Sequence, residues 1–265
     1  MKDILSEIIL NKKVEVARQK EQLSISEIEK QLLQKKDKIK FLSLNTALLS
    51  SKSGIIAEFK RRSPSKGWLH QNADVNSVTK AYENAGASAL SVLTDENYFG
   101  GTLADLNSAV KNAHIPVMRK EFIVDEYQIY QAKLLGASAI LLIAAAITKE
   151  ETNRFTKLAS ELQLDVLLEL HDESEIDHIT PLNNLIGVNN RNLGSFVTDL
   201  QKSFRMASLL PKDSLWVSES GISDANVVKE LREAGYKGFL IGEYFMKSGN
   251  PQKSLSDFIQ QIAGD

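Results

Sequence analysis

The sequence contains no cysteine, and this absence excludes three kinds of site at once. Disulfides, thiolate metal sites and a cysteine nucleophile all need a cysteine sulfur. Histidine is also scarce, because the chain has only four, and no two of them stand at the spacing of a metal-ligand pair. A dinucleotide-binding fingerprint is missing as well. We therefore expect no metal and no nucleotide cofactor.

Long hydrophobic runs are missing too. The longest apolar run, residues 139–147, has nine residues, whereas a membrane-spanning helix needs about 20. This run predicts a buried strand and the first residues that follow it. We expect no membrane association. Asp3 and Glu7 interrupt what would be the apolar core of a signal peptide, so we expect a cytoplasmic protein. A formal net charge of −2 argues against a nucleic-acid partner.

The first forty residues form a distinct region that lacks glycine and proline and is rich in Lys, Glu, Gln and Leu. Two overlapping capping-box patterns occur here, Ser24 with Glu27 and Ser26 with Glu29. We predict an N-terminal helical extension over residues 1–50. Its apolar residues need a surface to cover, namely Ile8, Ile9, Leu32 and Leu33.

From residue 51 onward the pattern changes to short apolar runs that alternate with helical stretches. The eight runs begin at Ile55, Ala89, Val117, Ala139, Asp165, Leu185, Leu215 and Gly238. Their starts are 20 to 34 residues apart, enough for one strand and one helix each time, which predicts a parallel sheet. Glycines 86, 136 and 235 recur a few residues before a run, where they suit the left-handed end of a helix.

All eight runs look buried, and none reads as a polar edge strand. This favours a closed barrel over an open sheet, so we predict an α/β fold with a single (β/α)8 TIM barrel over residues 51–265. An open doubly wound sheet is the alternative.

Charged and polar side chains follow several of the predicted strands at their carboxyl ends, where barrel enzymes place their chemistry. Strand alternation puts each set on one face of its strand. The set comprises Glu58, Lys60, Lys120, Glu169, Asn189, Arg191 and Glu219. A single such residue is usually a solvated strand end or a structural ion pair. Five strands with the same feature instead indicate a shared polar site. His171, beside Asp172, is predicted to be a loop histidine without a role.

Two glycine-containing segments follow the seventh and eighth runs, residues 218–223 and 240–245. Barrels commonly hold a phosphate at these two positions, on backbone N–H groups. Ser223 is the predicted N-cap of the next helix. With Arg191 nearby, and with the segment 60–67 after the first strand offering Lys and Ser donors, we expect the mouth of the barrel to bind a phosphorylated anion.

At these residues the sequence resembles the indole-3-glycerol-phosphate synthase family of tryptophan biosynthesis. The matching segments are AEFKRRSPSKG (57–67), MRKEFIVDEYQI (118–129), LLELHD (167–172), IGVNNRNL (186–193), VSESGIS (217–223) and FLIGEYFM (239–246). They extend from the first predicted strand to the last. The helical extension before residue 50 also resembles the family's, which partly covers the barrel mouth.

The resemblance implies a carboxy-lyase without cofactor or metal. The implied reaction is ring closure, decarboxylation and dehydration of 1-(2-carboxyphenylamino)-1-deoxy-D-ribulose 5-phosphate. By this similarity Lys120 is the general acid, Lys60 contacts the substrate carboxylate, and Glu169 is the acid/base partner for loss of the hydroxyl. The remaining polar shell would be Glu58, Asn189, Glu219 and Ser220, and the phosphate would be held by Ser63, Arg191, Gly221 and Gly242. Tyr244 departs from the small residue expected after Gly242, which puts side-chain contacts to the phosphate there in doubt.

Three other readings stay open at this point. Phosphoribosylanthranilate isomerase shares the phosphate site, but its chemistry favours a cysteine, which this chain lacks. A Schiff-base aldolase would use Lys60 or Lys120 as the amine nucleophile. A non-catalytic sugar-phosphate binder would need the phosphate site but not the paired lysines and glutamates. The sequence does not determine the oligomeric state, and we favour a monomer.

Overall fold

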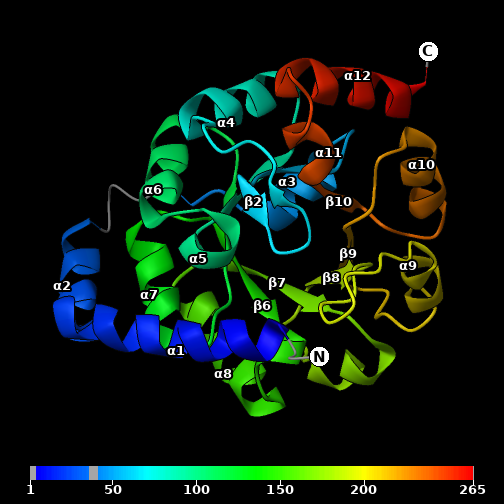
Figure 1. Ribbon diagram of the computed structural model, residues 1–265. Coiled ribbons are helices and arrows are strands. Elements are labelled where there is room, and N and C mark those ends of the chain that lie inside the picture. The colour runs from blue at the N-terminus through cyan, green and yellow to red at the C-terminus, as the bar shows by residue number, and fades with distance from the viewer. Residues whose placement is uncertain (1–3, 36–40, 265) are drawn as a thin grey trace.

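The computed structural model describes residues 4–35 and 41–264. Within them, eight parallel strands close into a barrel in the order β1-β10-β9-β8-β7-β6-β5-β4 (Figure 1). The barrel strands are β1 (Ile55–Phe59), β4 (Ala89–Leu93), β5 (Val117–Lys120), β6 (Ala139–Ile143), β7 (Asp165–Leu170), β8 (Leu185–Asn189), β9 (Leu215–Glu219) and β10 (Gly238–Ile241). Each begins at the residue that the apolar runs predicted. The predicted TIM barrel is confirmed, and the open sheet was the wrong alternative.

Helices cover the outside of the barrel and follow the strands in turn (Figure 1). They are α4 (Val75–Asn84), α5 (Glu96–Phe99), α6 (Leu103–Asn112), α7 (Glu126–Leu134), α8 (Lys149–Glu161), α9 (Gln201–Met206), α10 (Ala225–Glu233), α11 (Glu243–Met246) and α12 (Pro251–Ala263). Two 3-10 helices, η1 (Ala144–Ala146) and η2 (Glu173–His178), follow β6 and β7. A short antiparallel pair, β2 (Arg62–Ser63) and β3 (Gly67–Trp68), forms the hairpin after β1.

Local signals explain where several helices begin and end. Gly86, Gly136 and Gly235 all have positive φ directly after α4, α7 and α10, as the sequence predicted for left-handed helix ends. The predicted N-cap of α10 was wrong by one residue. Asp224 caps this helix instead of Ser223, because its carboxylate accepts a hydrogen bond from the backbone N–H of Asn226.

The N-terminal region contains α1 (Ile4–Gln22), α2 (Ile25–Lys35) and α3 (Leu44–Ser50). Of the two capping-box patterns, Ser24 with Glu27 is the one that forms, at the break between α1 and α2. Residues 36–40 of the predicted extension lie outside the described residues. Ile8 is buried as expected, but Leu33 is 76% exposed, so the expectation that it covers a surface was wrong.

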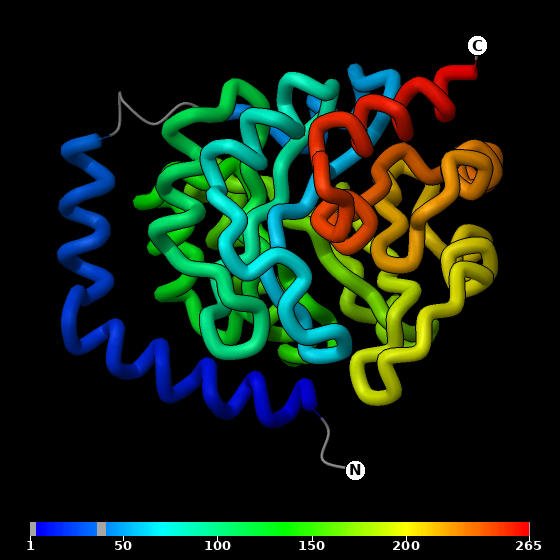
Figure 2. The backbone as a smooth tube through the Cα atoms, turned by 45° about the horizontal axis from the view of Figure 1, so that its top comes forward, coloured from blue at the N-terminus to red at the C-terminus, as the bar shows by residue number. Residues whose placement is uncertain are grey.

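These N-terminal helices occupy two different places. Figure 2 shows α1 along one end of the barrel, toward which the β2–β3 hairpin extends. By contrast, α3 lies at the amino-terminal ends of the strands, where Ser43 donates a hydrogen bond to Asp165, the first residue of β7. Leu44 and Leu48 of α3 are buried within the interior cluster of the barrel. The two ends of the barrel are therefore covered by different parts of the same region.

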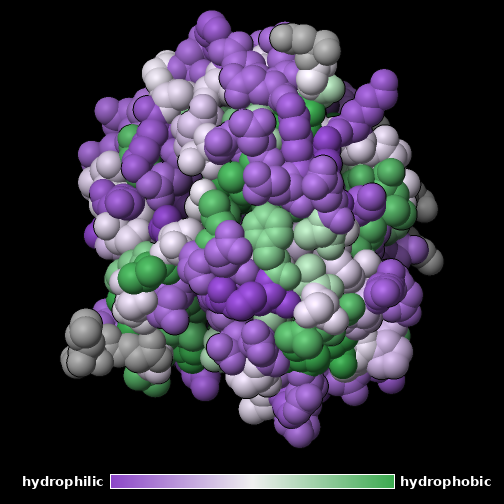
Figure 3. Space-filling view, turned by 90° about the vertical axis from the view of Figure 1, so that its right-hand side faces the viewer, coloured by the Kyte–Doolittle hydropathy of each residue, from purple (hydrophilic) through white to green (hydrophobic). Residues whose placement is uncertain are grey.

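The described residues form three buried hydrophobic clusters. The largest lies between strands and helices, a smaller one fills the barrel interior, and a third joins α1 and α2 to α7 through Val16, Ile28 and Tyr127. The face over the C-terminal helices is mostly hydrophilic, with apolar residues interspersed (Figure 3). No helix within residues 4–35 and 41–264 is long and apolar enough to cross a membrane.

Candidate active site

A pocket of about 390 Å³ opens at the carboxyl ends of the barrel strands. It is lined by every residue that the sequence analysis selected for a site, namely Glu58, Lys60, Ser63, Lys120, Glu169, Asn189, Arg191, Glu219, Ser220, Gly221 and Gly242. Parallel pairing explains the convergence, because the strand ends are neighbours: Asn189 lies opposite Glu219, and Ile143 opposite Glu169. The period-two pattern along each strand thus predicted the spatial grouping correctly.

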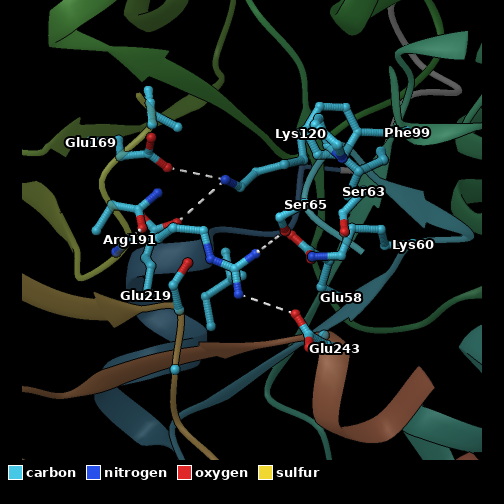
Figure 4. A pocket seen from close by; sticks show the side chains of 18 of the residues that line it. Glu58, Lys60, Ser63, Ser65, Phe99, Lys120, Glu169, Arg191, Glu219 and Glu243 are labelled. Atoms are coloured by element: carbon cyan, nitrogen blue, oxygen red, sulfur yellow. Dashed lines mark hydrogen bonds and ion pairs between the residues drawn. The ribbon is translucent and has the colours of Figure 1, made fainter. Parts of the chain in front are cut away.

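Lys120, at the end of β5, is the centre of the first cluster in the pocket (Figure 4). Its Nζ lies 3.0 Å from Oε2 of Glu169 and 3.4 Å from Oε2 of Glu219. The lysine side chain is 13% exposed, and both carboxylates are almost fully buried. Neither oxygen of Glu219 accepts a hydrogen bond from a described residue. Buried polar atoms of this kind are costly unless a ligand or water pairs with them.

The two carboxylates differ in their electrostatic surroundings. Burial opposes ionisation of Glu169, but the positive charges of Lys120 and His171 outweigh it and hold the pKa of this carboxyl well below its usual range. Burial and the negative charge of Glu169 instead raise the pKa of Glu219 well above its usual range. Burial likewise opposes the charge of Lys120, but Glu169, Glu219 and Glu58 together raise the pKa of its ammonium group. Lys120 therefore stands between one carboxyl group whose surroundings favour its ionised form and one whose surroundings favour its protonated form.

His171 lies in the loop after β7, as the sequence predicted. The sequence analysis gave it no role, and the structure places its Nε2 3.1 Å from Oε1 of Glu169 with its side chain 9% exposed. Its backbone N–H donates to Glu175 at 2.7 Å, which fixes the turn after β7. The signal was present in the sequence, because His171 stands two residues after Glu169 and alternation places both on one face.

A second ion pair joins Glu58 and Lys60 on β1 and just beyond it, with Oε1 of Glu58 2.6 Å from Nζ of Lys60. Gly242 makes this position accessible, since a Cβ at residue 242 would overlap the Glu58 carboxylate. Gly187 does the same for Glu219, because a Cβ there would overlap Oε1 of Glu219. Sequence reasoning missed the function of Gly187, whose contact with Glu219 depends on the pairing of β8 with β9.

The third group surrounds Arg191, whose guanidinium points toward Ser65 and Glu243 in Figure 4. Its guanidinium donates to Oγ of Ser65 at 3.0 Å and to Glu243 at 3.1 Å. The hydroxyl of Ser63 is buried without a hydrogen-bond partner among the described residues. Ser220 and Gly221 have φ of 68° and 80°, so the chain turns sharply where it borders the pocket. Tyr244 also lines the pocket and is 41% exposed.

Apolar side chains complete the wall. Ile4, Leu5 and Ile8 of α1 line the pocket together with Phe99 of α5 and Phe122 after β5. The aromatic pair Phe99 and Phe122 lies with ring centroids 5.9 Å apart. The sequence predicted an apolar covering role for α1 in general terms, but it did not identify which residues face the site. The pocket thus combines an apolar side with two ion-pair clusters and a basic group.

Comparisons with known proteins agree with this geometry. Solved structures of a tryptophan synthase complex and of thiamine phosphate pyrophosphorylase, both from Pyrococcus furiosus, share the fold. Their TM-scores are 0.59 and 0.58, at 11% and 14% sequence identity over 81% and 82% of this chain and 99% and 100% of theirs.

Similarity in sequence is far more specific. The indole-3-glycerol phosphate synthase from Bacteroides thetaiotaomicron is 53% identical over 262 residues, which cover 99% of this chain and 100% of the relative. The enzyme of the same name from Aliarcobacter butzleri is 40% identical over 96% of this chain and 98% of its own. The model of this family, a family of carboxy-lyases, matches residues 5–258. The resemblance predicted from the motifs is confirmed: the chain belongs to the indole-3-glycerol phosphate synthase family.

Proposed function

We propose that this pocket converts 1-(2-carboxyphenylamino)-1-deoxy-D-ribulose 5-phosphate to indole-3-glycerol phosphate, carbon dioxide and water. The observation that carries the proposal is the position of Lys120 in the pocket, with its Nζ 3.0 Å from Glu169 and 3.4 Å from Glu219. Ring closure needs a proton at the substrate's carbonyl oxygen as the aromatic carbon attacks the carbonyl carbon. A charged lysine within a buried acidic cluster is suited to supply it.

The other residues divide the remaining steps. Lys60, already paired with Glu58, is placed to attract the substrate carboxylate until the carbon–carbon bond to it breaks and carbon dioxide leaves. The electron pair of that bond restores the double bond of the ring. Glu169 then serves as acid/base partner when the hydroxyl departs as water, with His171 3.1 Å from its other oxygen. Asn189, Glu219 and Ser220 complete the polar shell around the reacting atoms.

The substrate phosphate would bind near Arg191, where Ser63, Gly221 and Gly242 also line the pocket. Ser63 supports this assignment because its buried hydroxyl lacks a partner among the described residues. Arg191 would exchange part of its contact with Glu243 for the phosphate. The cytoplasmic location and the monomeric state stay predictions from the sequence.

Incubation of the purified protein with this substrate tests the proposal. We expect indole fluorescence to appear together with one equivalent of carbon dioxide, and a folded Lys120→Met protein to be the inactive control. Binding of the substrate without product would support the non-catalytic sugar-phosphate binder instead. Trapping of a covalent adduct on Lys60 or Lys120 by borohydride would support the aldolase reading.

A further inference from the structure

Lys12 of α1 lies in a second buried ion cluster, of which only Glu121 lines the pocket. Its side chain is 1% exposed, and it is the one charged residue among the buried residues of α1, which are otherwise Leu5, Ile8 and Val16. Its Nζ lies 2.8 Å from Glu15, 3.0 Å from Oδ2 of Asp95 and 3.1 Å from Oε1 of Glu121. Glu15 belongs to the same helix, but Asp95 and Glu121 belong to the barrel. Lys12 therefore joins the extension to the barrel through two buried carboxylates.

Each of these carboxylates is also fixed to a segment that lines the pocket. Asp95 is the N-cap of α5, because its Oδ1 accepts a hydrogen bond from the N–H of Tyr98 at 2.7 Å. The next residue along α5, Phe99, lines the pocket. Lys12 thus holds the barrel side of the apolar wall through the cap of α5.

Glu121 makes the corresponding connection on β5. It directly follows Lys120, and its Oε1 accepts a hydrogen bond from the N–H of Phe122 at 2.9 Å. Its Oε2 accepts one from the hydroxyl of Thr94 at 2.7 Å. The carboxylate that Lys12 binds is therefore tied into the turn between the lysine of the acidic cluster and a second pocket aromatic.

The helix that carries Lys12 supplies the opposite part of this wall. Ile4, Leu5 and Ile8 line the pocket, and Lys12 stands one helical turn beyond Ile8 on the same face. Figure 2 shows α1 stretched along the end of the barrel. Other polar contacts also hold α1, because Tyr98 donates a hydrogen bond to Glu7 and Lys20 pairs with Asp125. The Lys12 contacts differ from these in that the lysine and both of its barrel partners are buried.

We propose that Lys12 is a positioning residue, which fastens α1 over the pocket mouth and so sets the apolar wall against which the substrate's aromatic ring packs. The identity of that ring rests on the proposed function, but the attachment of α1 to the barrel by Lys12 does not. Lys12 does not line the pocket and so does not contact the substrate. Its loss should therefore weaken substrate binding while the chemistry at Lys120 continues. In addition, α1 should open more often than the rest of the protein.

The test compares Lys12→Met with Lys13→Met, a change at the neighbouring exposed lysine of the same helix. We expect Lys12→Met to raise KM about tenfold and to change kcat less than threefold. Hydrogen exchange of the α1 amides should accelerate at least tenfold, with the strands unaffected. Lys13→Met should behave as the wild type in all three measurements. Unchanged KM and unchanged α1 exchange in Lys12→Met would overturn the proposal.

The double variant Lys12→Met with Asp95→Asn separates the effect of Lys12 on the position of α1 from its effect on the stability of the whole protein. Lys12→Met leaves Asp95 buried without its cation, whereas asparagine removes that charge and keeps an oxygen for the cap of α5. We expect the double variant to regain thermal stability while KM and α1 exchange stay raised. Recovery of KM together with stability would overturn the proposal, because Lys12 would then only neutralise Asp95. If the wild type showed no turnover, the proposed function would fail, whereas α1 exchange would still test the fastening.

Discussion

Lys12 and Lys120 are both buried lysines that lie between two carboxylates of the barrel, but their surroundings differ in one respect. Around Lys12 the carboxylate oxygens of Glu121 also accept hydrogen bonds from Thr94 and Phe122. Buried carboxyl oxygens without a hydrogen bond from a described residue occur in both clusters, Oδ2 of Asp95 in one and both oxygens of Glu219 in the other. Lys120, Glu169 and Glu219 all line the pocket, whereas of the Lys12 cluster only Glu121 does.

The difference separates a structural ion cluster from a chemical one. A buried lysine that lies between carboxylates and does not line a cavity serves to hold two segments together. When the lysine and its carboxyl groups line a cavity, a ligand can pair with the buried oxygens that lack a hydrogen bond. Burial and charge alone do not distinguish the two clusters, since the net effect of their neighbours raises the pKa of both lysines.

The largest effect should come from making the same substitution in each cluster. Lys120→Met should lower kcat about a hundredfold or more, which is the usual scale for losing general acid catalysis, and should change KM much less. Lys12→Met should show the reverse pattern. Steady-state kinetics on both folded variants, with folding checked by circular dichroism, makes the comparison. A Lys120→Met protein that keeps more than a tenth of wild-type kcat would remove Lys120 from the chemistry.

A smaller effect should follow from a substitution that disturbs the Lys120 cluster but removes no charge. In Gly187→Ala the new Cβ would overlap Oε1 of Glu219, so this carboxyl group must move away from Lys120. We expect kcat to fall about tenfold and stability to fall by about 1–3 kcal/mol, as is typical of overpacking.

Gly249→Ala is the matched control, because a Cβ there would meet no atom within 4 Å. It should leave kcat unchanged and stability within about 0.5 kcal/mol of the wild type. Equal kcat values for Gly187→Ala and the wild type would show that the position of Glu219 is unimportant to turnover.

The sequence predicted the Lys120 cluster far better than the Lys12 cluster, for a physical reason. Glu58, Lys120, Glu169 and Glu219 interrupt apolar strands at a period of two, and the barrel topology brings all strand ends together. The family resemblance then gave each residue a role.

Lys12 gave no such signal, because it precedes another lysine and its barrel partners, Asp95 and Glu121, lie more than 80 residues away along the chain. Only the docking of α1 decides that Lys12 is buried while Lys13 is exposed. The contact of His171 with Glu169 has the same origin, since it depends on how the turn after β7 is placed. Long-range packing is what the local pattern omits.

The smallest effect concerns how the raised pKa of Glu219 makes stability depend on pH. Burial and the charge of Glu169 raise its pKa, so the native protein keeps a proton that the unfolded chain releases above about pH 4.3. The stability from this proton is fully present below that pH and is lost as pH rises through the raised pKa of Glu219. Glu169, with its lowered pKa, acts in the opposite sense and at lower pH, because its contribution is lost as pH falls through that pKa.

Replacing Glu219 with glutamine keeps the neutral form and removes its titration. The free energy of unfolding from urea titrations between pH 5 and 9 should therefore shift in favour of Glu219→Gln as pH rises. The slope of the difference should be at most about 1.4 kcal/mol per pH unit, which corresponds to one whole proton. Glu233→Gln, at an exposed position on α10, should give a flat difference over the same range. A flat difference for Glu219→Gln as well would mean that Glu219 is already ionised beside Lys120. The Lys120 cluster would then be an ordinary ion cluster like that of Lys12.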